Sequence, residues 1–135
     1  MNQSHTKYEL AEYAKRAPRT HYKELIERDG GFTVDLLGNR PLRGYIVSLS
    51  GYTSRIPLTL FEDNDVSEFA TLHSPKLFKP LHYIGAWVED GEVWLDVSEQ
   101  LFSRDGAIQA GISRNQIAIW DVVNKCEIAT GGSGD

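Results

Sequence analysis

The residues best suited to binding chemistry are two opposed tryptophans beside a glycine and an aspartate. In the segment 83–98, an Asp-Gly dipeptide separates two apolar runs. This dipeptide is a preferred centre of a two-residue hairpin, because both turn residues need a positive φ. The resulting register opposes Trp87 to Trp94 and Gly85 to Asp96, which leaves room beside the rings for a base, a sugar or a partner side chain. Period-two alternation predicts a face made of Tyr83, Gly85, Trp87, Trp94, Asp96 and Ser98.

Packing alone also accounts for the two tryptophans. An aromatic pair across a hairpin stabilises it by about 0.5 to 1.5 kcal/mol beyond the burial of its area. In this interpretation the N-terminal helices cover the indoles, through Tyr8, Tyr13, Leu25 or Ile26. The sequence leaves both alternatives open, and the solvent exposure of the rings decides between them.

Loop arginines form a second candidate site. Arg40 and Arg43 flank a turn, Arg55 lies in the next loop, and the stretch 36–61 contains no acidic residue. If the loops meet at one end of the sheet, the guanidinium groups could bind a phosphate or carboxylate in bidentate fashion. The alternative is that they are ordinary solvated loop side chains. Together with the aromatic face, the candidate binding residues are Trp87, Trp94, Tyr83, Asp96, Arg40, Arg43 and Arg55.

No pattern for catalysis or metal binding is present. The histidines lack the HExxH spacing and the chain has one cysteine, Cys126, which argues against a zinc site. The run 63–65 resembles the start of a calcium loop but lacks its glycine, so helix capping explains it better. Position 48 is serine rather than the first glycine of a G-x-S-x-G elbow. The sequence therefore predicts no catalytic residue, metal ligand or cofactor.

Charge is distributed unevenly along the chain. Residues 1–61 carry nine Lys/Arg against six Asp/Glu, a charge of +3, whereas residues 62–135 carry five against thirteen, a charge of -8. The net charge of -5 argues against direct nucleic-acid binding, because that affinity comes mainly from cations that displace counterions. The acidic clusters at 62–68 and 89–99 are either solvated faces or a surface for a basic protein partner.

These residues must be positioned by a single domain, since 135 residues is close to the usual length of one. Apolar periodicity and capping residues predict helices over 4–17, over 21–28 after Thr20, after Asn64 or Asp65, and after Ser103, with a helical turn at Ser74-Pro75. Strands are expected at 32–36, 44–49, 56–60, 83–89, 92–98, 116–123 and 126–129. Pro57 would place its strand at an edge or would stand at a strand start. The run 116–123 is typical of a central strand covered on both faces.

The expected fold is therefore α+β, with a mostly antiparallel sheet of five to six strands and helices packed on it. A meander made only of strands is the main rival. We expect the domain to span 1–130, with an N-terminal helical segment at 1–29 and a flexible tail at 131–135. No membrane span or signal peptide is evident, which favours a cytoplasmic location.

The strand motifs resemble a set of small proteins encoded by phages and mobile elements, chiefly of actinobacteria. The similarity covers about residues 30 to 132, and the motifs that carry it are 31–35, 44–48, 83–87, 95–98 and 115–121. The resemblance implies a setting and no catalytic residue. In that setting, we expect a non-enzymatic protein that binds a macromolecular partner, as a structural accessory or an inhibitor of host defence. The alternative is a small-molecule enzyme or ligand-sequestering protein that uses the loop arginines with an acid or a histidine.

Overall fold

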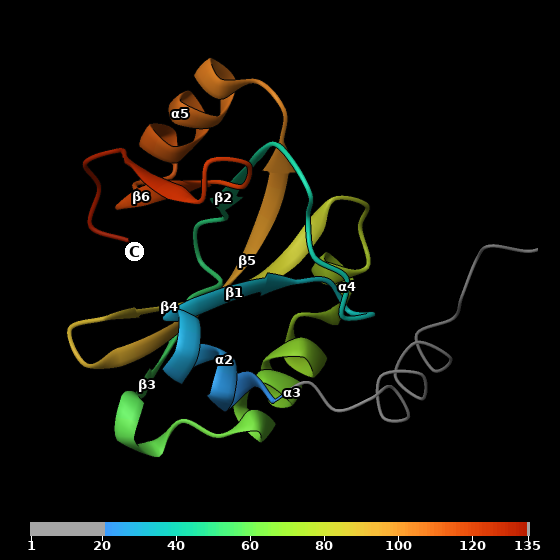
Figure 1. Ribbon diagram of the computed structural model, residues 1–135. Helices are drawn as coiled ribbons and strands as arrows, with labels where there is room; N and C mark the ends of the chain where they lie inside the picture. Colours follow the sequence, from blue (N-terminus) through green and yellow to red (C-terminus); the bar gives the residue numbers. More distant parts are fainter. Residues whose placement is uncertain (1–20, 135) are drawn as a thin grey trace, which may run out of the picture.

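The computed structural model describes residues 21–134, which form an antiparallel sheet with helices packed against it (Figure 1). The expected α+β class is confirmed, and the sheet has seven strands rather than five or six. The expected helix over 4–17 and the residues Thr20, Tyr8 and Tyr13 lie outside the described residues. Strand order is β1-β4-β5-β2-β6-β7, with β3 paired to β5 beside β2. The bounds are β1 (Gly31–Val34), β2 (Tyr45–Ser48), β3 (Ser54–Pro57), β4 (His82–Glu89), β5 (Glu92–Leu101), β6 (Ala118–Asp121) and β7 (Cys126–Ala129).

The hairpin β4–β5 is the centre of this sheet. Its register is the predicted one, with Trp87 opposite Trp94 and Gly85 opposite Asp96. Asp90 and Gly91 have φ values of 50° and 74°, as a type I′ turn requires. β5 is long enough to pair with β3 over its first half and with β2 over its second half. One hairpin therefore organises most of the fold.

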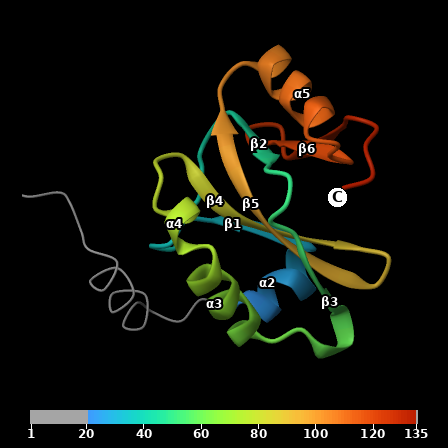
Figure 2. The ribbon, with the colours of Figure 1, turned by 180° about the vertical axis from the view of Figure 1, so that it is seen from behind.

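All described helices pack on one face of the sheet, which we call the convex face. Its side chains include Ile84, Ala86, Val93, Leu95 and Val97, which form a core with α2 (Tyr22–Asp29), α3 (Asp63–Leu72) and α4 (Ser74–Leu77). At the other end of the sheet, α5 (Arg104–Ser113) packs through Ala107 on Val47 and Ile119. Figures 1 and 2 show α5 at one end and the other helices at the opposite end.

The opposite face is concave, because the sheet curls until its two ends face each other across a cavity. Register places Thr33, Gly85, Trp87, Asp96 and Ser48 on this concave face, together with Ile46, Ser98, Trp120 and Glu127. Strands β1 and β7 stand at opposite ends of the strand order. In both ribbon views β6 nevertheless lies across from β1 and β4 (Figures 1 and 2).

The helix starts differ from the predicted caps. α2 begins after His21, which makes no side-chain cap, and the backbone N–H of Lys23 instead donates to Asp63 Oδ1 at 2.8 Å. α3 is capped by Glu62 rather than by Asn64 or Asp65. The backbone N–H of Glu62 donates to Asp65 Oδ2 at 2.8 Å, which completes a capping box. The cap of α5 is the predicted one, since Ser103 Oγ accepts from Gly106 N at 3.1 Å.

Two strand predictions need correction. The strand expected at 56–60 lies at Ser54–Pro57, and a 3-10 helix, η1 (Leu58–Leu60), follows Pro57, which cannot donate to a ladder. The strand expected at 116–123 is covered on one face only. α5 covers Ile119 on the convex face, but no described helix covers the concave face, where Trp120 is 38% exposed.

The end of the chain runs back along the loop before β6. Gly132 N donates to the Gln116 carbonyl at 2.9 Å and Gly134 N donates to the Asn115 carbonyl at 2.9 Å. Gly134 is buried, and the flexibility that the composition predicts for this glycine-rich segment stays a prediction. No described helix is both long enough and apolar enough to cross a membrane.

Candidate functional site: the cavity of the concave face

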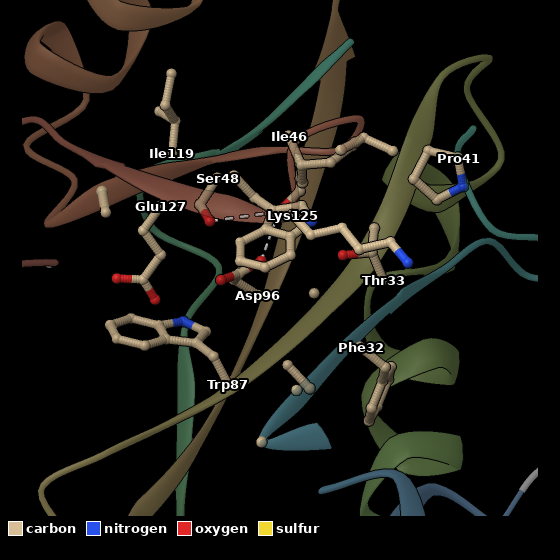
Figure 3. A pocket seen from close by; sticks show the side chains of 18 of the residues that line it. Phe32, Thr33, Pro41, Ile46, Ser48, Trp87, Asp96, Ile119, Lys125 and Glu127 are labelled. Carbon is tan, nitrogen blue, oxygen red and sulfur yellow. Dashed lines mark hydrogen bonds between the residues drawn. The ribbon is translucent and has the colours of Figure 1, made fainter. Parts of the chain in front are cut away.

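A cavity of about 630 Å³ occupies the concave face (Figure 3). Six strands line it, namely β1, β2, β4, β5, β6 and β7. Its volume lies within the range of about 300 to 1,000 Å³ that is typical of small-molecule sites. The lining residues that matter most for its chemistry are Thr33, Ser48, Trp87, Asp96, Trp120 and Glu127.

The floor of the cavity carries a buried carboxyl group. Asp96 is 4% exposed, and its Oδ1 accepts a hydrogen bond from Ser98 Oγ at 2.6 Å. Ser48 Oγ lies 3.3 Å from Ser98 Oγ and extends this polar chain to β2. Burial raises the pKa of Asp96, and hydrogen bonds from Ser98, Ser48 and Trp87 oppose that rise. The floor therefore offers hydroxyls and a carboxyl group in a setting of low polarity, where hydrogen bonds to a ligand are strong.

The position of the Asp96 carboxyl group depends on Gly85. A Cβ atom at this position would lie 2.5 Å from Asp96 Oδ1 and 3.1 Å from Ser98 Oγ. Gly85 and Asp96 are register partners on adjacent strands, so their side-chain positions point to the same face. The Asp96 carboxyl group therefore occupies the position beside the rings that Gly85 leaves open, and a ligand there stays a prediction.

The two tryptophans have different surroundings. Their rings lie 4.9 Å apart between centroids at an interplanar angle of 50°, and Trp87 lines the cavity. Trp94 is 6% exposed and lies between Trp87 and the guanidinium of Arg55, which is 3.9 Å from the Trp94 ring centroid. Gly134 also lies against Trp94, since a Cβ atom there would be 2.6 Å from the ring.

The expected cover over the indoles is wrong for the described residues. Leu25 and Ile26 belong to the core on the convex face, not to the tryptophan face. Trp94 is contacted instead by Arg55 and by the segment that ends at Gly134. One ring is thus buried, and the other is a wall of the cavity.

Charged groups line the mouth of the cavity. Arg40 and Lys125 are exposed cations, and neither forms an ion pair within residues 21–134. Asp29 pairs with Arg28 at 2.8 Å, and this hydrogen bond lowers the pKa of the Asp29 carboxyl. In Figure 3, Trp87 and Glu127 lie at one end of the cavity, whereas Thr33 and Pro41, which follows Arg40, lie at the other.

The predicted binding residues are only partly brought together. Trp87, Asp96 and Arg40 line the cavity, and Trp94 adjoins it. Tyr83 does not line it, because its hydroxyl donates to Gln100 Oε1 at 2.9 Å. The arginines do not converge: the Arg43 guanidinium lies 4.9 Å from the ring centroid of Phe102, and that of Arg55 lies on Trp94. A binding role for any of the seven stays a prediction.

Several lining residues were not predicted from the sequence. Alternation would have shown that Trp120 and Glu127 point away from Ile119 and Ile128, but not that their strands close over β4. Thr33 is the register partner of Gly85, and this pairing joins residues 52 positions apart in the chain. Local patterns contain no information on such long-range pairings.

The acidic cluster at 62–68 is largely explained by local structure. Asp63 and Asp65 satisfy helix N-terminal amides, as described above. Glu62 pairs with Lys23 at 3.2 Å, and Glu68 accepts from Asn64 Nδ2 at 3.0 Å. In the second cluster, Asp96 is the buried floor of the cavity and Glu99 pairs with Arg114. These groups therefore do not form one continuous acidic surface.

No protein-family profile, curated protein or solved structure matches this chain. Among residues 21–134, no group of three or more His, Cys, Asp and Glu side chains is placed to hold a metal ion.

Proposed function

We propose that this protein is a non-enzymatic binder of a small molecule, which it holds in the cavity of the concave face. One observation carries the proposal: six strands enclose about 630 Å³ above a buried carboxyl group. A buried carboxyl group is stable where it is hydrogen-bonded, and Ser98 supplies such a bond to Asp96 beside this cavity. A concave site with a few convergent polar groups is the usual place for a ligand.

Binding fits the cavity better than catalysis does. The closest pair of reactive groups is Ser98 with Asp96, and the serine donates its proton to the carboxyl oxygen. Activation of a serine nucleophile normally requires a base oriented by a third group. The described lining of the cavity contains neither a histidine nor a cysteine.

The proposal also fits the phage or mobile-element setting that the resemblance implies. A small protein that sequesters a small molecule would withdraw it from a host system, including a defence system. Ligand sequestration, the alternative at the sequence level, thus takes the place of the expected macromolecular binding as the leading proposal. Arg40 and Asp96 contribute to it, whereas Arg43 and Arg55 do not line the cavity.

A thermal-shift screen of a chemically diverse small-molecule library tests the proposal. Thr33 lines the cavity, so Thr33→Phe should fill part of it. Thr59 lies in η1, is exposed and does not line the cavity, so Thr59→Phe is the matched control. Compounds that raise the melting temperature of the wild type and of Thr59→Phe, but not of Thr33→Phe, support the proposal. Equal shifts in all three proteins, or none in any, contradict it.

A protein partner is the second candidate, and exposed apolar side chains favour it. Leu42 is 86% exposed, Val123 65% and Phe102 50%. Strand register and the bond from Val122 N to the Gly44 carbonyl bring these segments to the same end of the sheet. Large exposed apolar side chains that gather on a monomer often mark an interface. Leu42→Glu with Val123→Glu should abolish capture of such a partner and leave binding in the cavity unchanged.

A further inference from the structure

We infer that the ligand of the cavity is a nucleoside phosphate, with its base against Trp87 and its phosphate near Arg40 and Lys125. The inference rests on the proposed function and adds a ligand class to it. It depends on the separation of two kinds of lining group along one cavity. In Figure 3, Trp87 and Glu127 lie at one end, Thr33 and Pro41, which follows Arg40, lie at the other, and Lys125 lies between these ends.

The aromatic end is suited to a nucleobase. Trp87 offers a flat ring at the cavity wall, and stacking on an aromatic side chain stabilises a bound base. Asp96 lies on the floor beside this ring, where its carboxyl group can accept from an exocyclic amino group. Carboxylates read cytosine in this way, and adenine and guanine carry amino groups as well. Ser48 adds a hydroxyl that donates or accepts.

The Trp87 ring packs against Trp94. The Arg55 guanidinium lies 3.9 Å from the Trp94 ring centroid, and the Trp94 and Trp87 rings are tilted by 50° with their centroids 4.9 Å apart. Of these three side chains, Trp87 alone lines the cavity. A ring fixed in this way loses little conformational entropy when a base stacks on it, which favours binding.

The cationic end is suited to a phosphate. Arg40 and Lys125 line the mouth, and neither has an ion pair within residues 21–134. Arginine binds phosphate through paired N–H groups, and lysine binds it as a point charge. The sugar of a nucleotide would span the distance between the two ends.

Other ligand classes fit less well. A wholly apolar ligand would make no use of the Ser48 hydroxyl or of the charged groups Arg40, Lys125 and Glu127. A simple anion would meet Asp96 and Glu127, and a simple cation would meet Arg40 and Lys125. A ligand that has hydrogen-bond donors at one end and negative charge at the other can bind both the two acidic and the two basic side chains.

Isothermal titration calorimetry tests the inference. The probes are AMP, GMP, CMP and UMP, the matching nucleosides, and inorganic phosphate. We expect at least one of AMP, GMP and CMP to bind about tenfold more tightly than its nucleoside and than UMP, a difference of about 1.4 kcal/mol. Inorganic phosphate alone should bind more weakly still.

Variants then locate the two ends of the ligand. Arg40→Ala with Lys125→Ala should remove the preference for the nucleotide over its nucleoside. Lys79→Ala, an exposed lysine that does not line the cavity, is the matched control and should leave this preference intact. Asp96→Asn should weaken binding of the amino-bearing nucleotide about tenfold, and the effect on UMP should be small.

The outcomes separate the inference from the proposed function. If no nucleotide binds, but a compound from the thermal-shift screen protects the wild type and not Thr33→Phe, the ligand class is wrong and the binding site stands. If nucleotides bind equally to Thr33→Phe and to the Arg40/Lys125 variant, they bind elsewhere and the inference is overturned. If neither nucleotides nor library compounds bind, both proposals fail.

Discussion

Gly85 and Asp96 face each other across the β4–β5 ladder, and the aspartate side chain occupies the position where a Cβ atom of residue 85 would lie. The distance from that Cβ position to Asp96 Oδ1 is 2.5 Å. The absence of a side chain at Gly85 is thus what allows a carboxyl group to fold inward onto the sheet. This pairing sets both the depth of the cavity and the buried position of its acid.

Gly85→Ala should destabilise the protein, because the added methyl group collides with a buried carboxyl group. Overpacking of this kind costs about 1 to 3 kcal/mol of unfolding free energy. The cost should be smaller in an Asp96→Ala background, where the colliding atom is absent. A double-mutant cycle from urea unfolding measures this coupling. Additive effects would show that the two positions do not compete for the same space.

Asp96→Asn should change how stability depends on pH. Burial raises the pKa of Asp96 above its ordinary value of 3.8, so the folded protein holds this proton more tightly than the unfolded chain does. The protonated Asp96 carboxyl group therefore makes its full contribution to stability below pH 3.8, and this contribution is lost as pH rises through the folded-state pKa. Asparagine stays neutral throughout.

The unfolding free energy of Asp96→Asn minus that of the wild type should therefore increase as pH rises from about 4. Urea unfolding at a series of pH values measures this difference. Asp90→Asn, at the exposed hairpin turn, is the matched control. A constant difference for Asp96→Asn would contradict a raised pKa at the floor of the cavity.

Gly91→Val should destabilise the hairpin for a conformational reason alone. Gly91 has a φ of 74°, and no atom lies within 4 Å of the position that a Cβ would take. A β-branched residue resists this backbone conformation, so we expect a loss of more than about 1 kcal/mol. Gly91→Asn is the control, because asparagine tolerates a positive φ and should lose much less. Equal urea midpoints for the wild type and the valine variant would argue against the turn geometry.

Trp94 and Trp87 should respond differently to removal. Trp94 is 6% exposed, so Trp94→Ala should cost about 3 to 5 kcal/mol of unfolding free energy. Trp87 lines the cavity, so Trp87→Ala should cost less stability and weaken ligand binding. In variants that retain one tryptophan, acrylamide should quench Trp87 more readily than Trp94. Removing residues 131–135 should increase quenching of Trp94, because Gly134 covers it.

The sequence predicts the parts of this fold that depend on neighbouring residues. The Asp-Gly turn fixed the register of β4–β5, and Ser103 marked the start of α5, because both signals act over a few residues. The α2 and α3 caps were missed because Lys23 N binds Asp63, 40 residues away, and because glutamate is an uncommon N-cap.

The sequence predicts the part of the cavity that the β4–β5 hairpin forms, but not the part that β6 and β7 form. The space beside Gly85 and the face of Trp87 follow from alternation along one hairpin. The contribution of Trp120, Lys125 and Glu127 follows from the curl of the sheet, which joins β6 and β7 to β2 and brings them opposite β4. Strand order is a long-range property, and no local pattern specifies it.

An NMR titration tests the central claim most directly. Uniformly ¹⁵N-labelled protein would be mixed with a small-molecule extract of bacterial cells from which macromolecules have been removed by filtration. We predict that the shifted signals are those of the concave face, including the Gly85, Asp96 and Ser48 amides and the Trp87 indole N–H, and that they do not shift in Thr33→Phe. Shifts confined to the helices and the convex face, or identical shifts in Thr33→Phe, would contradict a ligand site in the cavity.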